Sequence, residues 1–339
     1  MNRRLSSLAL CAALFLGLAA CGPTEATPTP TPAIERKSQV GFYFDTVVTM
    51  EVYTSDDTLL SDAQKECQYY DNLLSKSYKG SDVWNINHAN GKRVAVSDET
   101  REILEKALEY SRLSGGAFDI TIEPCVALWD FTGEDMGLLP DETALAKAAA
   151  KVDWTQVDVN DEGVLLPAGM TIDLGAIAKG YITDRIADFL KARGVESGLL
   201  NFGGNVLVIG NKPDGSQWNI GVQDPLGLRD QSIVGAVRVT SHAVVTSGIY
   251  ERGFDLDGVR YHHILEPSSG WPVQNELAGV SIIAADAFDA DALSTTVFAM
   301  GVEEGTAFIE SLDGIEAIFV TRDDQVTWTS GLEDIFVLA

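Results

Sequence analysis

The sequence predicts an α+β fold in which largely antiparallel sheets are flanked by helices. Its β-rich segments come in runs, and helical patterns interrupt them at irregular intervals. A doubly wound parallel sheet is disfavoured, because no GxGxxG fingerprint or Walker loop stands at a strand-to-helix turn. With 339 residues, 45% of them apolar and 22% charged, the chain is long enough to bury a core.

The first half of the folded body, which we expect to begin near residue 40, combines short strands with longer helices. Residues 46–54 are β-rich, and Asp56 or Asp57 can then cap a helix that runs to about residue 76. Ser97 caps a second helix, which Gly115-Gly116 ends. Further elements expected here are a strand at 93–96, a helix from Pro140 to Lys151, a strand at 170–174 and a helix from about 176 to 193.

The second half consists mostly of strands, recognised as β-branched and apolar runs. The spacing of apolar residues predicts a helix at about 289–300 and a shorter one after Glu303. The expected strands lie within 199–210, 218–222, 233–239, 243–247, 280–285 and 316–321.

Acidic residues dominate the charge of the chain. It carries 24 Lys and Arg against 50 Asp and Glu, a formal net charge of −26, which repels phosphate backbones and anionic lipid surfaces. Because the acids are spread along the chain without a block of like charge, most of them are expected on a solvated surface. Nucleic acid is therefore not an expected partner.

The N-terminus has the pattern of a processing signal. Arg3 and Arg4 form a positive n-region, and residues 5–17 form an apolar h-region. LAAC at 18–21 resembles the lipobox of bacterial lipoproteins, which implies cleavage before Cys21 and lipid attachment to it. An ordinary secreted protein cut near residue 20 is the alternative. We expect a signal peptide at 1–20, a Pro/Thr-rich tether at 21–39, and a protein anchored by lipid on the extracytoplasmic face of the cell membrane.

Two cysteines remain outside this signal. Cys67 falls on the apolar face of the first expected helix, which favours a buried thiol. A disulfide with Cys125 also suits an extracytoplasmic compartment, and the spacing does not decide between the two.

Two segments bring together groups that suit a binding site. If 289–301 is helical, Asp291 and Thr295 share one face with Ser294 beside them, and their oxygens suit Mg²⁺. Acids that merely favour a helix N-terminus are the alternative. In IDLGAIAKG, residues 172–180, Asp173 ends a strand and Lys179 opens the next helix, so a carboxylate and an ammonium converge. A surface ion pair would give the same pattern.

Eight blocks in order resemble the ApbE family of FAD:protein FMN transferases. The resemblance covers roughly residues 40 to 330, almost the whole expected body, and such an ordered set is far more specific than any single motif. The blocks are FDTVVTMEVY, SGGAFDITIEPCVALWDF, IDLGAIAKGYITD, LLNFGGNVLVIG, WNIGVQDP, VVTSGIYERGF, YHHILEPSSGWP and ADALSTTVFAMG.

The resemblance implies a reaction and a set of site residues. FAD would be split at its pyrophosphate, FMN attached to a threonine of a partner protein, and AMP released. The acceptor threonine is expected in a stretch resembling Asp-x-x-[Ser/Gly]-Ala-Thr, and a membrane redox-complex subunit is one candidate acceptor. The implied FAD contacts are Ser77, Ala117, Phe118, Asp119, Asp173, Lys179 and Ile264. The implied Mg²⁺ ligands are the main-chain carbonyl of Ala176 with Asp291, Ser294 and Thr295.

The chain departs from the family pattern in three places. Residues 44–46, Phe-Asp-Thr, stand where members usually carry Met-Gly-Thr, and Glu266-Pro267 replaces Asp-Pro. Ser294 stands where some members carry a third acid, which makes it either a weaker ligand or a structural residue.

Two of the four histidines of the chain are adjacent, at His262 and His263. The family pattern aligns His263, and imidazole titrates near neutrality, so His263 is the candidate catalytic base or threonine-orienting group. If 262–265 is a strand, the two rings point to opposite faces and only one can face the site. A structural role for both is the alternative.

Two other functions fit the sequence. A metal-dependent FAD pyrophosphatase would use the same site with water in place of threonine. A solute-binding lipoprotein would bind a ligand without turnover, which the convergent metal oxygens and His263 argue against.

Overall fold

The computed structural model describes residues 33–131, 133, 136–227 and 232–339. One compact unit extends from Ile34 to Ala339. The expected signal peptide, Cys21 and most of the expected tether lie outside the described residues. Strand β1 (Glu35–Tyr43) begins before the expected start near residue 40, because polar residues of this edge strand pair with β2 while their side chains remain in or near solvent.

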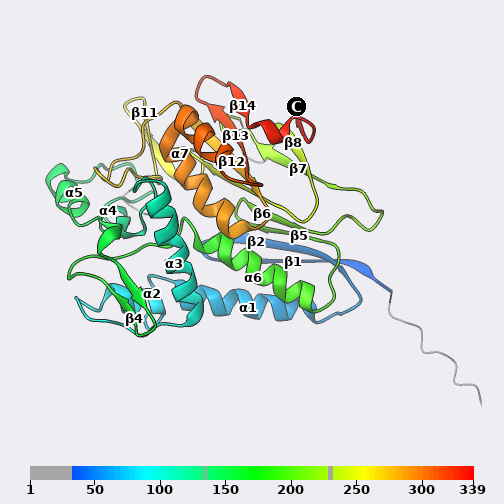
Figure 1. Cartoon of the computed structure of the whole chain (residues 1–339), viewed down its shortest axis with the longest axis horizontal. Coiled ribbons are helices and arrows are strands. Elements are labelled where there is room, and N and C mark those ends of the chain that lie inside the picture. Colours follow the sequence, from blue (N-terminus) through cyan, green and yellow to red (C-terminus); the bar gives the residue numbers. More distant parts are fainter. Residues whose placement is uncertain (1–32, 132, 134–135, 228–231) are drawn as a thin grey trace, which may run out of the picture. The chain divides into compact units, whose positions relative to one another are not determined.

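A large antiparallel sheet forms the centre of the unit and confirms the predicted α+β class (Figure 1). Its strand order is β1-β2-β5-β6-β9-β12-β13-β14, and each neighbouring pair is antiparallel. After β1 its strands are β2 (Thr46–Thr54), β5 (Gly198–Phe202), β6 (Asn205–Ile209), β9 (Ala243–Gly248), β12 (Leu277–Ala284), β13 (Glu316–Thr321) and β14 (Val326–Trp328).

A smaller antiparallel sheet covers part of the large one. Its order is β15-β8-β7, with β7 (Trp218–Gln223), β8 (Ile233–Val239) and β15 (Phe336–Leu338). Successive side chains of a strand point to opposite faces. Accordingly Ile282 packs in the core shared with the helices, while Ile283 packs in the core shared with the small sheet. The large sheet therefore lies between a helical layer and the small sheet.

The helices that cover the large sheet also carry much of the candidate site. Helices α1 and α7 both pack against α6, and α7 also packs against β9 and β12. Among the described residues, none of the helices combines the length and apolar character needed to cross a membrane. The helices are α1 (Leu59–Leu74), α2 (Asp82–Asn87), α3 (Asp98–Leu113), α4 (Glu123–Val126), α5 (Glu142–Ala149), α6 (Ala178–Ala192) and α7 (Ala287–Glu310), with short 3₁₀ turns at Ile120–Ile122, Trp154–Gln156 and Ser330–Leu332.

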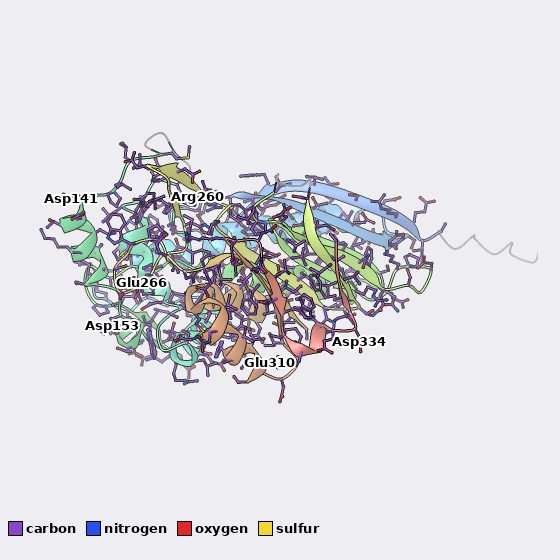
Figure 2. All side chains as sticks on the ribbon, turned by 90° about the horizontal axis from the view of Figure 1, so that it is seen from above. Asp141, Asp153, Arg260, Glu266, Glu310 and Asp334 are labelled. Atoms are coloured by element: carbon purple, nitrogen blue, oxygen red, sulfur yellow. The ribbon has the colours of Figure 1, made fainter. Side chains whose placement is uncertain are left out.

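An aromatic cluster forms a separate small core where α4 and α5 meet the hairpin of β10 (Gly253–Leu256) and β11 (Val259–His262). Trp129, Phe131 and Phe254 are its large buried rings. Figure 2 shows Asp141, which caps α5, and Glu266, just after this hairpin, toward the end of the unit away from Asp334. A second small hairpin joins β3 (Asp158–Asn160) and β4 (Gly163–Leu165).

Two expected strands are absent from the sheets. At 93–96 only Val94 pairs, in an isolated bridge with Val164. At 170–174 the chain is extended, but the amide of Ile172 donates to the Asn87 side chain and that of Asp173 donates to the Ile120 carbonyl. These bonds are made to the end of α2 and to a 3₁₀ turn instead of to a neighbouring strand, so the alternation of buried residues gave a misleading signal.

Helix boundaries differ from expectation where they matter for the site. Helix α1 ends at Leu74 instead of near residue 76, which leaves Lys76 in the following loop. Helix α6 begins at Ala178, two residues later than expected. The two helical segments expected near 289–300 and after Glu303 are both present in α7, separated by a non-helical Gly301 with φ of 82°.

Candidate functional site

A cavity of about 670 Å³ brings together segments that lie far apart in the sequence. The β1–β2 turn, the chain after α1 and the segment before α4 form part of its wall. The β5–β6 turn, the start of α6, the first half of α7 and the segments after β9 and β11 complete it. Its volume is in the range of about 300–1,000 Å³ that is usual for small-molecule sites.

Almost all residues that the sequence suggests for the site line this cavity. They are Ser77, Ala117, Phe118, Asp119, Asp173, Ala176, Lys179, His263, Ile264, Asp291 and Thr295. Ser294 does not line it. Its buried hydroxyl donates to the Asp291 carbonyl oxygen and lies 2.8 Å from Ser247 Oγ. The structure therefore favours the structural role of Ser294 over the role of metal ligand.

Asp291 lies at a close contact between α6 and α7. Its side chain is 3% exposed, and its Oδ1 lies 3.1 Å from Lys179 Nζ. The main-chain amide of Gly180 donates to Asp291 Oδ2 over 2.8 Å. Glycine is required at this contact, because a methyl group at Gly180 would overlap the Ala287 carbonyl and the Asp291 side chain. Gly180 is the third residue of α6, where amides lack an intrahelical acceptor, so Asp291 supplies an acceptor from α7.

Three residues that line the cavity carry oxygens suitable for a hard cation. They are the carboxylate of Asp291, the hydroxyl of Thr295 and the main-chain carbonyl of Ala176. Within the described ranges there is no group of three or more His, Cys, Asp or Glu side chains that could hold a metal ion. A cation at this place would be held by one carboxylate and by neutral oxygens. Mg²⁺ accepts such a set of ligands when substrate and water oxygens fill its remaining coordination positions.

Two charged residues on another part of the wall, Lys76 and Asp173, form a cluster with Glu123, which does not line the cavity. Lys76 Nζ is 2.6 Å from Asp173 Oδ2 and 2.7 Å from Glu123 Oε2. The amide of Gly175 donates to the other oxygen of Asp173 over 2.6 Å. Asp173 is therefore paired with Lys76, and Lys179 is paired with Asp291, so the carboxylate and ammonium that the sequence placed together have different partners.

The protonation of this cluster follows from burial and from its own charges. Burial, opposed by the Lys76 ammonium, raises the pKa of Glu123 to about 7. Burial would raise the pKa of Asp173 as well, but the Lys76 ammonium outweighs it and that pKa is lowered. Glu123 is thus the member of the cluster that exchanges a proton near neutral pH. Sequence reasoning missed Lys76 and Glu123, although each lies within four positions of a suggested residue, because their pairing depends on the fold.

Asp119 lines the cavity, but its carboxylate oxygens are already bonded. Oδ1 accepts hydrogen bonds from the amide and hydroxyl of Thr121, and Oδ2 accepts one from the amide of Trp154. Burial raises the pKa of Asp119, although these bonds oppose the shift. Asp119 thereby fixes the turn that carries Ala117 and Phe118 at the cavity wall.

The two adjacent histidines lie in different surroundings. His262 is fully buried, its Nε2 lies 3.0 Å from the Val273 carbonyl oxygen, and its ring packs edge-on against Phe298. His263 lines the cavity. Residues 262–265 do not form a strand, since β11 ends at His262, but only His263 of the pair lines the cavity. Burial lowers the pKa of His262 to about 4 and that of His263 to about 3, so both rings are neutral at pH 7.

The β1–β2 turn presents the first of the three family departures to the cavity. Tyr43 pairs with Thr46, so Phe44 and Asp45 form a two-residue turn, and their φ values are 55° and 56°. Both central residues of such hairpin turns need positive φ, which is unusual for phenylalanine. The amide of Phe44 donates to Asp71, and its ring stacks on Phe202 at 6.3 Å. These contacts hold Phe44 where it lines the cavity.

Aromatic side chains of the small core form a further part of the wall. Trp129 and Phe131 line the cavity, and their rings are stacked with centroids 5.2 Å apart. A flat apolar group could pack against such rings. Cys125 belongs to this small core and Cys67 to the main one, and both thiols are free. The two cysteines therefore do not pair.

Comparison with known proteins identifies the family of the chain. The family model described as the ApbE family matches residues 44–319. A protein of Klebsiella pneumoniae named FAD:protein FMN transferase is 37% identical over 290 residues, which cover 84% of this chain and 88% of that protein. The chain belongs to the ApbE family. A second ApbE-family relative with the same name, from Treponema pallidum, is 36% identical over 285 residues, with 79% of this chain and 78% of that protein covered.

Solved ApbE structures share the fold. The ApbE protein of Thermotoga maritima superposes with a TM-score of 0.82 at 31% identity, covering 89% of this chain and 99% of that one. The flavinyl transferase ApbE of Pseudomonas stutzeri superposes with a TM-score of 0.78 at 31% identity. The superposition covers 89% of this chain and 97% of that one. The resemblance inferred from the eight blocks is thereby confirmed at the level of family and fold.

Proposed function

We propose that this ApbE-family protein is a Mg²⁺-dependent FAD:protein FMN transferase that attaches FMN to a threonine of a partner protein. The observation that carries the proposal is the convergence on one cavity of Asp291, Thr295, the Ala176 carbonyl, Lys179 and His263. The relatives that are named FAD:protein FMN transferase support the same reaction.

The residues present fit a magnesium ion. Asp291, Thr295 and the Ala176 carbonyl would hold it, because one nearly buried carboxylate with neutral oxygens at the same cavity is a donor set that suits a hard cation. When bound, Mg²⁺ would neutralise charge on the diphosphate of FAD. Lys179 already lies 3.1 Å from Asp291 Oδ1, so it would supply positive charge next to the same diphosphate.

His263 would take the proton of the acceptor hydroxyl. The threonine oxygen forms a bond to the phosphorus on the FMN side, and the bond from that phosphorus to the bridging oxygen breaks. AMP leaves with the bridging oxygen. His263 Nδ1 lies 3.4 Å from the Arg252 carbonyl oxygen, which favours a proton on Nδ1 and leaves Nε2 to accept the hydroxyl proton.

The test uses the protein from residue 21 onward, FAD, Mg²⁺ and a peptide containing Asp-x-x-Ser-Ala-Thr. We expect flavin fluorescence on the denatured peptide, a mass increase equal to FMN minus water, and one AMP per peptide modified. A matched peptide with valine in place of the threonine should remain unmodified. Release of FMN and AMP at the same rate with either peptide would identify a FAD pyrophosphatase instead, and binding of FAD without turnover would identify a ligand-binding lipoprotein.

We also propose that lipid on Cys21 anchors the protein at the extracytoplasmic face of the cell membrane. The support is the LAAC stretch and the Pro/Thr-rich segment after it. Cys21→Ser should move the protein from the membrane fraction to an unprocessed or soluble form, because the tether has no apolar surface to retain it. If a variant from which the signal peptide has been removed persists in membranes washed with high salt, the anchor is contradicted. Cys67→Ser, which changes a buried thiol, is the control that should stay membrane-bound.

A further inference from the structure

Helices α6 and α7 are joined by two contacts that are one helical turn apart on each helix. At the cavity end, Gly180 of α6 donates to Asp291 of α7. Four residues further along α6, Asp184 accepts hydrogen bonds from the amides of Ala287 and Phe288, at 2.9 and 2.8 Å. Ala287 precedes Asp291 by four residues, so the helices are antiparallel and matched turn for turn.

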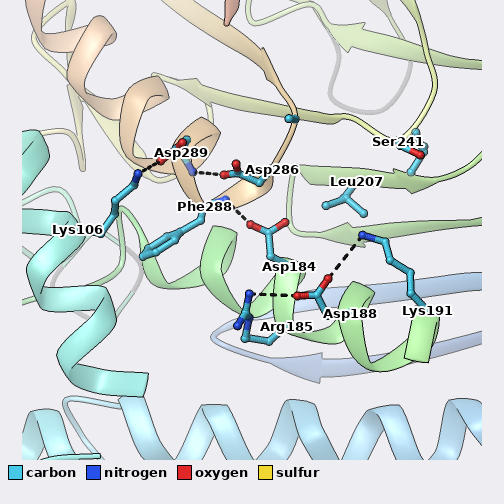
Figure 3. A pocket seen from close by; sticks show the side chains of 12 residues that line it. Lys106, Asp184, Arg185, Asp188, Lys191, Leu207, Ser241, Asp286, Phe288 and Asp289 are labelled. Carbon is cyan, nitrogen blue, oxygen red and sulfur yellow. Dashed lines mark hydrogen bonds and ion pairs between the residues drawn. The ribbon is translucent and has the colours of Figure 1, made fainter. Parts of the chain in front are cut away.

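Asp184 satisfies amides at the start of α7 that the helix cannot satisfy itself. The first amides of a helix lack intrahelical acceptors. The side chain of Asp286, the N-cap of α7, accepts a hydrogen bond from the amide of Asp289. Asp184 supplies acceptors from another helix for two more amides, so it ties the position of α7 along its axis to α6. Figure 3 shows Asp184 directed at the first turn of α7, beside Asp286 and Phe288.

The surroundings of Asp184 show that this carboxylate is not an ordinary surface acid. It lines a smaller cavity of about 270 Å³. The neighbouring cations are engaged elsewhere, since Arg185 and Lys191 pair with Asp188 and Lys106 pairs with Asp289. Burial raises the pKa of Asp184 to about 7, although the two amides oppose the shift. The carboxylate is thus held mainly by the start of α7.

We propose that Asp184 is a positioning residue for the cation site, because it fixes the register of α7 against α6 and thereby holds Asp291 at the cavity. The inference rests on the proposed metal-dependent transfer. It assigns to Asp184 no contact with FAD, metal or acceptor, since Asp184 does not line the large cavity. Loss of Asp184 leaves Asp291 in the sequence but lets α7 shift along its axis, so the oxygens that would hold the cation no longer converge.

The test compares Asp184→Ala and Asp184→Asn with Asp188→Asn. Asp188 lies four residues along the same helix, lines the same small cavity and is the same residue type, but it bonds only to Arg185 and Lys191 in the described chain. Mn²⁺ binding is measured from the electron paramagnetic resonance of the free ion, and FMN transfer is measured across Mg²⁺ concentration. Circular dichroism and thermal unfolding report whether each variant is folded.

For Asp184→Ala we expect Mn²⁺ to bind about 10- to 100-fold more weakly, as when an outer residue that orients a ligand is lost. The Mg²⁺ concentration for half-maximal transfer should rise by the same factor, with kcat largely recovered at saturating Mg²⁺. Asp184→Asn keeps one acceptor oxygen, so its Mn²⁺ affinity should fall less than that of Asp184→Ala. It still tests the inference if the alanine variant does not fold. Asp188→Asn should match the wild type.

The inference would be overturned if a folded Asp184 variant binds Mn²⁺ like the wild type, whatever its melting temperature. The inference would also be overturned if Asp188→Asn weakened Mn²⁺ binding as much as the Asp184 variants do, since the cause would then be the change in net charge. If the wild type binds no Mn²⁺, the inference falls together with the cation site. If the wild type binds Mn²⁺ but does not transfer FMN, the proposed function fails, while the binding comparison still decides the role of Asp184.

Discussion

Asp291→Asn is expected to lower the rate of FMN transfer by about a thousandfold at limiting Mg²⁺, since loss of a metal-held charge costs several kcal/mol and about 1.4 kcal/mol corresponds to a factor of ten. Asparagine keeps the shape of the side chain and one acceptor oxygen for the Gly180 amide, so the contact between α6 and α7 should persist. What it removes is the negative charge that faces Lys179 and would balance the cation. FAD should still bind, because the rest of the cavity wall is unchanged.

The measurement is a single-turnover assay of FMN transfer across Mg²⁺ concentration, with FAD affinity followed separately by flavin fluorescence. Asp289→Asn is the matched control. It removes the same charge from the same helix, but Asp289 pairs with Lys106 and does not line the large cavity. Near wild-type transfer by Asp291→Asn at limiting Mg²⁺ would exclude Asp291 as a ligand.

His263→Ala is expected to lower the transfer rate by about 10²- to 10⁴-fold, the usual contribution of a general base. Because burial lowers the pKa of His263 to about 3, its ring is neutral in the free protein at any pH above about 4 and is ready to accept a proton. The negative charge of bound FAD should favour the imidazolium form. The acid limb of kcat, which reports the bound state, should therefore lie at higher pH than the acid limb of kcat/KM, and His263→Ala should abolish this difference.

His262→Gln is the control for the histidine pair and should retain transfer activity, because His262 is buried away from the cavity. Its effect should appear in stability. The pKa of His262 is about 4 in the folded protein, below the ordinary 6.5, so the unfolded chain binds more protons between these values. Falling pH in this window therefore destabilises the wild type through His262, by up to about 1.4 kcal/mol per pH unit.

Denaturant unfolding of the wild type and His262→Gln between pH 6.5 and 4 checks this result. The variant should show the shallower loss of free energy of unfolding as the pH falls. If the free energy of unfolding falls equally steeply with pH in both proteins, His262 is protonated in the folded state. An inactive His262→Gln together with an active His263→Ala would reverse the assignment of the two rings.

Local chemistry explains which parts of the fold could be predicted. β2 has the expected bounds, 46–54, since alternating apolar and β-branched residues specify a half-buried strand. Helix α3 begins after Ser97 as expected, because a serine cap acts over a few residues. The strand expected at 170–174 failed because burial alternates there without a neighbouring strand to pair with, and sequence alone contains no information on that partner.

By itself the sequence determined the family, the α+β class and the candidate residues at the cavity, since eight ordered blocks preserve residue types whose chemistry is local. Only the tertiary structure decided which of these groups meet. It paired Asp173 with Lys76 and Lys179 with Asp291, turned Ser294 to Ser247, and separated His263 from His262. The physical reason is that ion pairs, burial and the register between helices depend on distances between segments that are far apart in the chain, such as α6 and α7. Those distances are fixed only when the core packs.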